Sequence, residues 1–254
     1  MYLSNSKRLL FIAIPKTACS SIMYALSSNK SVSNDSPTQI WNFKYPEIYH
    51  STLKDLFVNL DKTEHLGFDI LGVDNSFDTY SEFEDNYIHY QNKLQSSIVK
   101  EQYYKVAFVR NPWDKFVSGY LDMNRNVPGR FSKRYNIWAT QEETPDWYKS
   151  WNFKNFEDFC INLDDSGWLK DVHFKPQLDF ISIDGEVSVD FIGRFENLNE
   201  DYNKFLVNIG ADKISLPHTN RSNRGEYRNY YNIRTREIVG EFYKKDIEEF
   251  GYEF

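Results

Sequence analysis

Two short, largely apolar runs, each ending in a proline-containing loop, constrain the fold of this chain more than any other feature. Residues 9–14 read LLFIAI and lead into Pro15-Lys16, while residues 105–109 read KVAFV and lead into Arg110-Asn111-Pro112. Continuous apolar runs of this length are typical of central strands in a parallel sheet, because such strands are buried on both faces. Helix-forming sequence follows each loop, so each run predicts a strand–loop–helix unit.

Local signals place the helices of these two units. We expect the first helix over about residues 20–28 and the second over about residues 112–123. Asn111 can cap the second helix, and Pro112 suits its first position because proline lacks a backbone N–H. The helix of the second strand–loop–helix unit is therefore predicted to begin at Pro112.

The same pattern returns towards the carboxyl end of the chain. A third strand over residues 189–193 precedes a helix over about residues 196–209, which Gly210 terminates. Apolar residues at helical spacing predict a last helix over residues 238–250, with Gly251 as its stop. Alternating strands and helices favour the α/β class, with a mostly parallel sheet flanked by helices.

Length and composition limit the organisation and the function. The 254 residues suit a single domain spanning residues 1–254, in which residues 51–100 and 124–170 are interpreted as insertions. A net charge of −7 disfavours nonspecific nucleic-acid binding, because no overall positive field would attract phosphates. Two cysteines are too few for a disulfide framework, and no apolar stretch approaches about 18 residues. We therefore expect a cytoplasmic protein without stable membrane insertion.

The loop after the first predicted strand has the features of an anion site. Residues 14–21 read IPKTACSS and lie where a helix begins, so backbone N–H groups and the helix dipole favour a negative ligand there. Lys16 adds a positive charge. The pattern GxxxxGK[ST] of a Mg²⁺-nucleotide loop is absent from the chain. An ordinary turn with a solvent-exposed lysine is the alternative interpretation.

A second anion site is predicted after the second strand. Arg110 stands at the carboxyl end of that strand, where open α/β sheets bind ligands. Ser118 follows about two helical turns later, so both side chains can converge on one phosphate. Two such sites fit one ligand with two anionic ends.

These two segments resemble the sulfotransferases that use 3′-phosphoadenosine 5′-phosphosulfate (PAPS), in particular the branch that contains bacterial and Golgi carbohydrate sulfotransferases. That branch has a loop of the form IPKTAGTS and a segment of the form FVRNPWDRxVSxY, which here read IPKTACSS and FVRNPWDKFVSGY. FIGRFENL at residues 191–198 and LPHTNRSNRGEYRNYY at residues 216–231 extend the likeness. The resemblance implies a single P-loop-like α/β domain related to nucleotide kinases, and transfer of a sulfuryl group to a hydroxyl, with a carbohydrate as acceptor.

The resemblance also implies roles for individual residues. Lys16 would contact the 5′-phosphosulfate and stabilise charge on the leaving oxygen, while Arg110 and Ser118 would bind the 3′-phosphate. The polar, basic loop over residues 220–224 would cover the nucleotide; the alternative is a solvated loop without a ligand. No metal would be required. The remaining donors to the cofactor would be Thr17, Ala18, Cys19, Ser20 and Ser21 in the first loop, and Arg221 and Arg224 in the basic loop.

Sulfuryl transfer also needs a base, which in this family is commonly a histidine or a glutamate. His50 lies in YHSTLKDL, which resembles the HATxKEL-type segment of bacterial relatives, and is the first choice. His89 has the more usual spacing before Arg110 and is the second. For each of them, a surface histidine without a catalytic role is the alternative.

Two other functions remain open at this point. A P-loop kinase shares the sheet and a phosphate loop but needs a Mg²⁺ site. A noncatalytic nucleotide- or glycan-binding module would keep the fold without turnover. The aromatic and basic residues 125–151 can stack on sugars or form the core of a lid.

Overall fold

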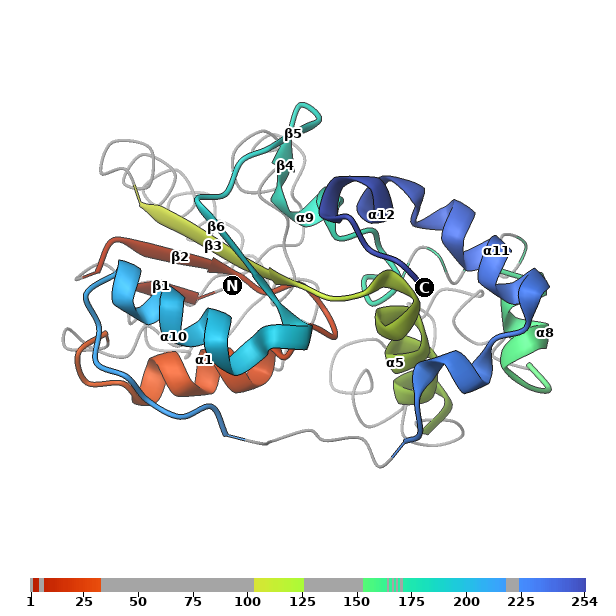
Figure 1. The fold of residues 1–254 in the computed structure, drawn as a ribbon, viewed down its shortest axis with the longest axis horizontal. Helices are drawn as coiled ribbons and strands as arrows, with labels where there is room; N and C mark the ends of the chain where they lie inside the picture. Colours follow the sequence, from red (N-terminus) through yellow and green to blue (C-terminus); the bar gives the residue numbers. More distant parts are fainter. Residues whose placement is uncertain are drawn as a thin grey trace, which may run out of the picture. The chain divides into compact units, whose positions relative to one another are not determined.

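The computed structural model places its described residues in two compact units (Figure 1). The first unit comprises Met1–Val109 with Gln177–Arg221, and the second comprises Arg110–Pro176 with Ser222–Phe254. The predicted insertion 51–100 lies outside the described residues. The structure describes residues 2–4, 7–32, 103–125, 153–163, 165, 167, 169, 171–217 and 224–254.

A four-stranded sheet organises the first unit. Its strands are β1 (Tyr2–Ser4), β2 (Leu9–Ile12), β3 (Tyr104–Val109) and β6 (Phe191–Arg194), in the order β1-β2-β3-β6. The pairs β2–β3 and β3–β6 are parallel, whereas β1 is antiparallel to β2. The predicted α/β class with a mostly parallel sheet is confirmed. β1 was not predicted from the sequence.

Helices α1 (Cys19–Ser28) and α10 (Leu198–Asn208) share a core with one face of this sheet. Aromatic rings cross the strands there: Phe108 lies 6.4 Å from Phe11 and 6.2 Å from Phe191 between centroids. Gly193 on β6 makes room for this contact, because a Cβ at that position would lie 2.3 Å from the Phe108 ring. A side chain at position 193 would clash with the Phe108 ring and disturb the packing of β3 against β6.

The shorter elements of the first unit lie before and after β6 in the chain. The helix α9 (Leu178–Ile181) leads into a two-stranded hairpin of β4 (Ser182–Ile183) and β5 (Glu186–Val187). The 3-10 turn η2 (Phe195–Asn197) joins β6 to α10. At the far end of α10, Gly210 has a left-handed φ of 59°, which confirms the predicted stop.

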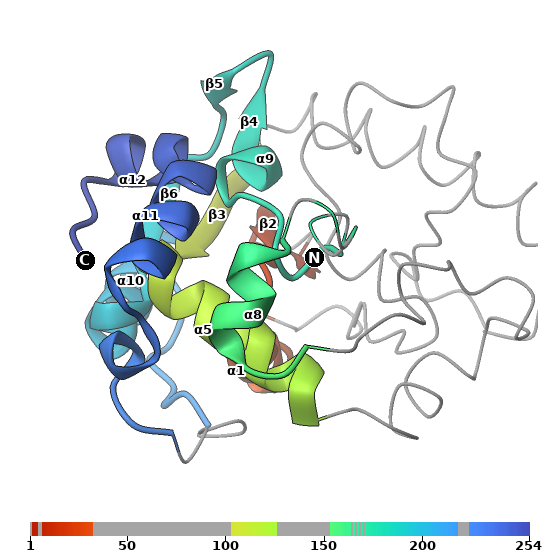
Figure 2. The same cartoon turned by 90° about the vertical axis from the view of Figure 1, so that its right-hand side faces the viewer.

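The second unit is a helical assembly around an aromatic core. It contains α5 (Pro112–Arg125), α8 (Phe156–Ile161), η3 (Tyr227–Tyr230), α11 (Ile233–Phe242) and α12 (Lys244–Phe250). Figure 2 shows α8 and α11 beside α5. The Phe116 ring of α5 lies within 5.9 Å of the rings of Phe156, Phe159 and Phe174.

The predicted last helix is wrong in its extent. The structure has two helices there, because the chain leaves helical geometry at Tyr243, where ψ is 21°. The first of them, α11, also begins earlier than predicted. Asn232 starts α11 with a capping box shared with Thr235. The fully buried Tyr243 donates its hydroxyl hydrogen to the Phe174 carbonyl, so a tertiary contact lies at the break. Among the described residues, no helix is long and apolar enough to span a membrane.

Candidate active site

The loop between β2 and α1 is shaped by its backbone. Lys16 and Ala18 both have left-handed conformations, with φ of 68° and 66°, although neither is glycine. Thr17 lies between them, is fully buried, and donates its hydroxyl hydrogen to the Ile14 carbonyl at 2.9 Å. Thr17 does not share their left-handed φ, and a turn that contains left-handed residues can direct successive backbone N–H groups towards an anion.

The first turn of α1 adds an electrostatic attraction for an anion next to this loop. The helix begins at Cys19 after the Ala18 N-cap, and its first turn contains no acidic residue. A ten-residue helix carries a partial positive charge at this end, which favours an anion. Cys19 stands where the related loops have glycine, yet it is helical and its side chain lies in the hydrophobic core. The left-handed positions fall on its neighbours, so cysteine fits here without backbone strain.

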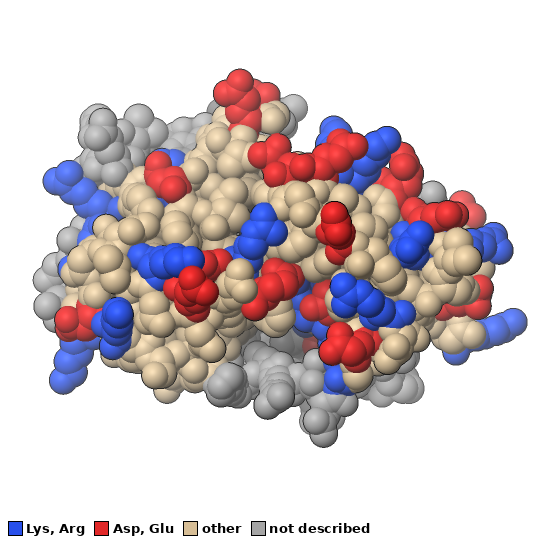
Figure 3. All heavy atoms as spheres, in the orientation of Figure 1, with Lys and Arg blue, Asp and Glu red and all other residues tan. Residues whose placement is uncertain are grey.

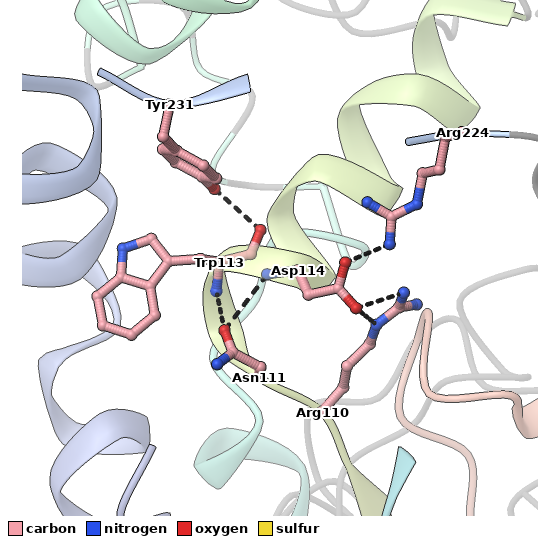
Figure 4. Close-up of polar contacts among 6 residues, drawn as sticks. All are labelled: Arg110, Asn111, Trp113, Asp114, Arg224 and Tyr231. Atoms are coloured by element: carbon pink, nitrogen blue, oxygen red, sulfur yellow. Dashed lines mark hydrogen bonds and ion pairs between the residues drawn. The ribbon is translucent and has the colours of Figure 1, made fainter. Parts of the chain in front are cut away.

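The start of α5 is fixed by the predicted cap. The Asn111 side-chain oxygen accepts from the backbone N–H of Trp113 at 3.1 Å and, more weakly, of Asp114 at 3.5 Å (Figure 4). Its amide group donates to the Glu253 carbonyl at 2.8 Å. Pro112 is the first helical residue, as predicted. The cap and the terminal segment therefore hold the turn in which Arg110 lies.

Asp114 joins two arginines within the second unit. Arg110 donates from Nε and Nη2 to Asp114 Oδ2, at 2.8 and 2.7 Å, and Arg224 Nη2 donates to Oδ1 of the same carboxylate (Figure 4). The side chains are largely buried, with exposures of 8 % for Arg110, 10 % for Arg224 and 15 % for Asp114. Two positive groups and one negative group leave a local net charge of +1. This cluster suits an anion.

Aromatic residues between η3 and α11 and at the end of the chain contact Trp113 beside this cluster. Tyr231 donates its hydroxyl hydrogen to the Trp113 carbonyl at 2.9 Å, and the Trp113 indole donates to the Arg236 carbonyl at 3.0 Å. The Trp113 ring meets Phe254 edge-on, with centroids 5.5 Å apart. Burial raises the pKa of Tyr231 well above its ordinary value, so its hydroxyl stays a donor at neutral pH.

On one face of the molecule, positive charge is mixed with negative charge. Figure 3 shows Lys and Arg side chains interspersed with Asp and Glu over the face in view. Among the described residues, no group of three His, Cys, Asp or Glu side chains is arranged to hold a metal ion. The cluster around Asp114 is a local source of attraction for an anion.

A buried pair in the second unit was not predicted. His173 Nδ1 lies 2.8 Å from Asp171 Oδ1, and the Asp171 side chain is 2 % exposed. Lys115 of α5, which is fully buried, donates from Nζ to the backbone carbonyls of His173 and Lys175 at 3.0 and 2.9 Å. The segment around His173 is thus tied to the helix that begins at the arginine cluster.

Comparison with known proteins now decides the family. The model of the sulfotransferase family matches residues 1–253. This chain belongs to the sulfotransferase family. The family that the motifs indicated is confirmed.

Individual relatives of this sulfotransferase-family chain are distant. Human carbohydrate sulfotransferase 9 is 22 % identical over 271 residues, which cover 99 % of this chain and 53 % of the human protein. An uncharacterized protein of Archaeoglobus fulgidus is 33 % identical over 108 residues, which cover 42 % of this chain and 68 % of that protein. The chain therefore spans about half the length of its human relative. No solved structure matches.

The structure distributes the predicted site residues of this family member over both units. Arg110 and Arg224 are brought together by Asp114, and Ser118 lies on α5, partly buried. His50, His89 and Arg221 lie outside the described residues. The loop residues of the first unit are Lys16, Thr17, Ala18, Cys19, Ser20 and Ser21.

Sequence reasoning missed Asp114 as part of the site. One signal for it exists, since Arg110 and Asp114 stand four residues apart across the start of a predicted helix, a spacing at which opposite charges can pair. No local signal connects Arg224 to this pair, because 110 residues separate it from Asp114. Only the fold brings Arg224 next to Asp114.

Proposed function

We propose that this chain transfers a sulfuryl group from PAPS to a hydroxyl group of a carbohydrate. Membership of the sulfotransferase family supports sulfuryl transfer, and the name of the human relative supports a carbohydrate acceptor. The observation that carries the proposal is the loop between β2 and α1, whose left-handed Lys16 and Ala18 stand directly before an uncapped helix start. We place this activity in the cytoplasm, without a nucleic acid as partner.

The residues present fit the two anionic ends of PAPS. In the first unit, Lys16 and the backbone and hydroxyl donors of residues 17–21 would hold the 5′-phosphosulfate, with no acidic residue in the first turn of α1 to repel it. In the second unit, Arg110 and Ser118 would hold the 3′-phosphate, with Arg224 of the same unit as a further donor. Arg221, which lies outside the described residues, would be another donor. The planar guanidinium of arginine suits a phosphate because it donates two parallel hydrogen bonds.

Thr17 has a narrower role than its hydroxyl suggests. That hydroxyl donates within the loop, to the Ile14 carbonyl, and so stabilises the turn. Its contribution to the donor would come from the backbone N–H. The side chain shapes the loop and the backbone meets the anion.

The chemistry follows from these placements. His50, or His89 in its place, would accept the proton of the acceptor hydroxyl as the acceptor oxygen forms its bond to sulfur. The bond between sulfur and the oxygen of the 5′-phosphate breaks, which yields a sulfate ester and adenosine 3′,5′-bisphosphate. The Lys16 ammonium and the loop N–H groups would stabilise the charge that develops on that oxygen. No metal ion takes part in this scheme.

The test is a transfer assay with radiolabelled PAPS and a panel of carbohydrates, run with and without EDTA. We expect label in the carbohydrate, undiminished by EDTA. Activity that EDTA abolishes and Mg²⁺ restores, or phosphate transfer from ATP, would favour the kinase and reject the proposal. Binding of the bisphosphate without any transfer would favour the noncatalytic module instead.

A further inference from the structure

We propose that Asp114 is a positioning residue, whose carboxylate holds Arg110 and Arg224 in one fixed arrangement for a phosphate. The inference rests on the proposed function, in which these arginines bind the 3′-phosphate of the donor. It adds to that function a residue that does not touch the ligand. Asp114 acts through the two guanidiniums that it joins.

The geometry around the carboxylate supports a fixed arrangement. Each oxygen of Asp114 takes a different arginine, Oδ2 from Arg110 and Oδ1 from Arg224. Arg110 is held by two of its donors, Nε and Nη2, along one edge of the guanidinium. Because the edge is fixed by two bonds, the plane of the guanidinium is fixed as well.

The backbone of Asp114 is itself well anchored. It lies in the first turn of α5, which Asn111 caps and which Tyr231 contacts through the Trp113 carbonyl. All three charged side chains are at least 85 % buried, so solvent screens their interactions only weakly. The carboxylate is therefore a rigid part of the helix and the arginines are oriented by it.

Such an arrangement lowers the cost of binding. A free arginine side chain loses rotamer freedom when it is immobilised by a ligand, and a pre-ordered side chain loses less. Asp114 also keeps two buried like charges together that would otherwise repel each other. The local net charge of +1 remains attractive to a phosphate.

This role predicts that loss of Asp114 changes the anion affinity in the direction opposite to that expected from simple electrostatics. Removal of a negative charge beside an anion site should strengthen anion binding by Coulomb's law. If Asp114 positions the arginines, its loss should weaken binding instead. In D114N one side-chain oxygen remains for one arginine, whereas the amide N–H₂ faces the donors of the other.

The experiment compares D114N, D114E and the matched control E241Q. Glu241 lies on α11 in the same unit with a side chain that is 79 % exposed, so E241Q removes one negative charge away from the cluster. Calorimetry measures the affinity for adenosine 3′,5′-bisphosphate. In the unliganded protein, ¹⁵N relaxation of the Nε–Hε groups reports the order of the Arg110 and Arg224 side chains.

We expect D114N to bind the bisphosphate about tenfold more weakly, the loss of roughly one charged hydrogen bond, with D114E intermediate and E241Q unchanged. At least one of the two arginines should become mobile in D114N. Equal or tighter binding by D114N, or arginines that keep their order, would overturn the inference. If D114N does not fold, D114E decides between these outcomes by the same two measurements.

The relaxation data also separate this inference from the proposed function. A wild-type protein that does not bind the bisphosphate rejects PAPS as donor. Arginine order that still depends on Asp114 in that case upholds the positioning role. Order that does not depend on Asp114 rejects it, whatever the protein binds.

Discussion

The loop between β2 and α1 and the start of α5 are both candidate anion sites, yet they are built by different means. The loop of the first unit relies on backbone conformation, with left-handed φ at Lys16 and Ala18. The start of α5 in the second unit relies on side chains, with Asp114 joining Arg110 and Arg224. A site made of backbone dipoles is altered by changes in φ preference, whereas a site made of ion pairs is altered by changes in charge.

The difference bears on what each site does. Backbone N–H groups and a helix dipole are fixed before the ligand arrives, which suits stabilisation of charge that develops during a reaction. Paired arginines supply full charges and bidentate hydrogen bonds, which suit affinity for a ground-state phosphate. We therefore expect the loop to govern turnover and the arginine cluster to govern donor affinity.

The largest expected effect is on turnover, in K16A. Loss of a positive group that stabilises the leaving oxygen should lower kcat about 10²- to 10³-fold, as for a lost oxyanion donor. Steady-state kinetics with PAPS checks it, with K213A as control because Lys213 is an exposed lysine of the same unit. A K16A enzyme with normal kcat would break the distinction between the two sites.

The next largest effect is on affinity, in R110A. Truncation of this buried arginine also leaves Asp114 with one partner fewer, so the Kd for adenosine 3′,5′-bisphosphate should rise about 10²-fold. Calorimetry measures it. R234A is the matched control, since Arg234 is exposed on α11. Unchanged affinity in R110A would show that the cluster around Asp114 does not bind the donor.

A third variant tests how much a buried side chain next to the arginine cluster contributes to the stability of the second unit. K115M removes a buried charged donor from the carbonyls of His173 and Lys175, and should lower the free energy of unfolding by about 2 kcal/mol. Urea denaturation followed by circular dichroism gives the value. The exposed Lys154 provides the control K154M. A K115M protein as stable as K154M would contradict this view.

The smallest effect concerns the backbone of the loop. A18G should raise the free energy of unfolding by about 0.5–1 kcal/mol, because glycine adopts a left-handed φ without strain. The same substitution in the interior of α1, A25G, should lower it by about 1 kcal/mol. Thermal and urea unfolding of the pair give the two signs. Equal signs would show that the loop is not held in a left-handed conformation.

Much of the structure around the two predicted loops was predictable because its signals are local. The apolar run 9–14 became β2, and the sequence after it became α1, one residue ahead of the expected start. Asn111 and Pro112 marked the first turn of α5 correctly, since a cap depends only on neighbouring residues. The three-residue strand β1 was missed because so short a segment carries no period, and it is a strand only through pairing with β2.

The sequence by itself determined the family, the strands β2 and β3 and the helices that follow them, because each depends on residues that stand close together in the chain. Only the tertiary structure decided that Arg224 meets Asp114, that the buried Lys115 donates to the carbonyls of His173 and Lys175, and that Tyr243 interrupts the last helix. The physical reason is range. Caps, turns and apolar periods are set within a few residues, whereas ion pairs and buried hydrogen bonds join side chains whose separation in the chain leaves no local trace.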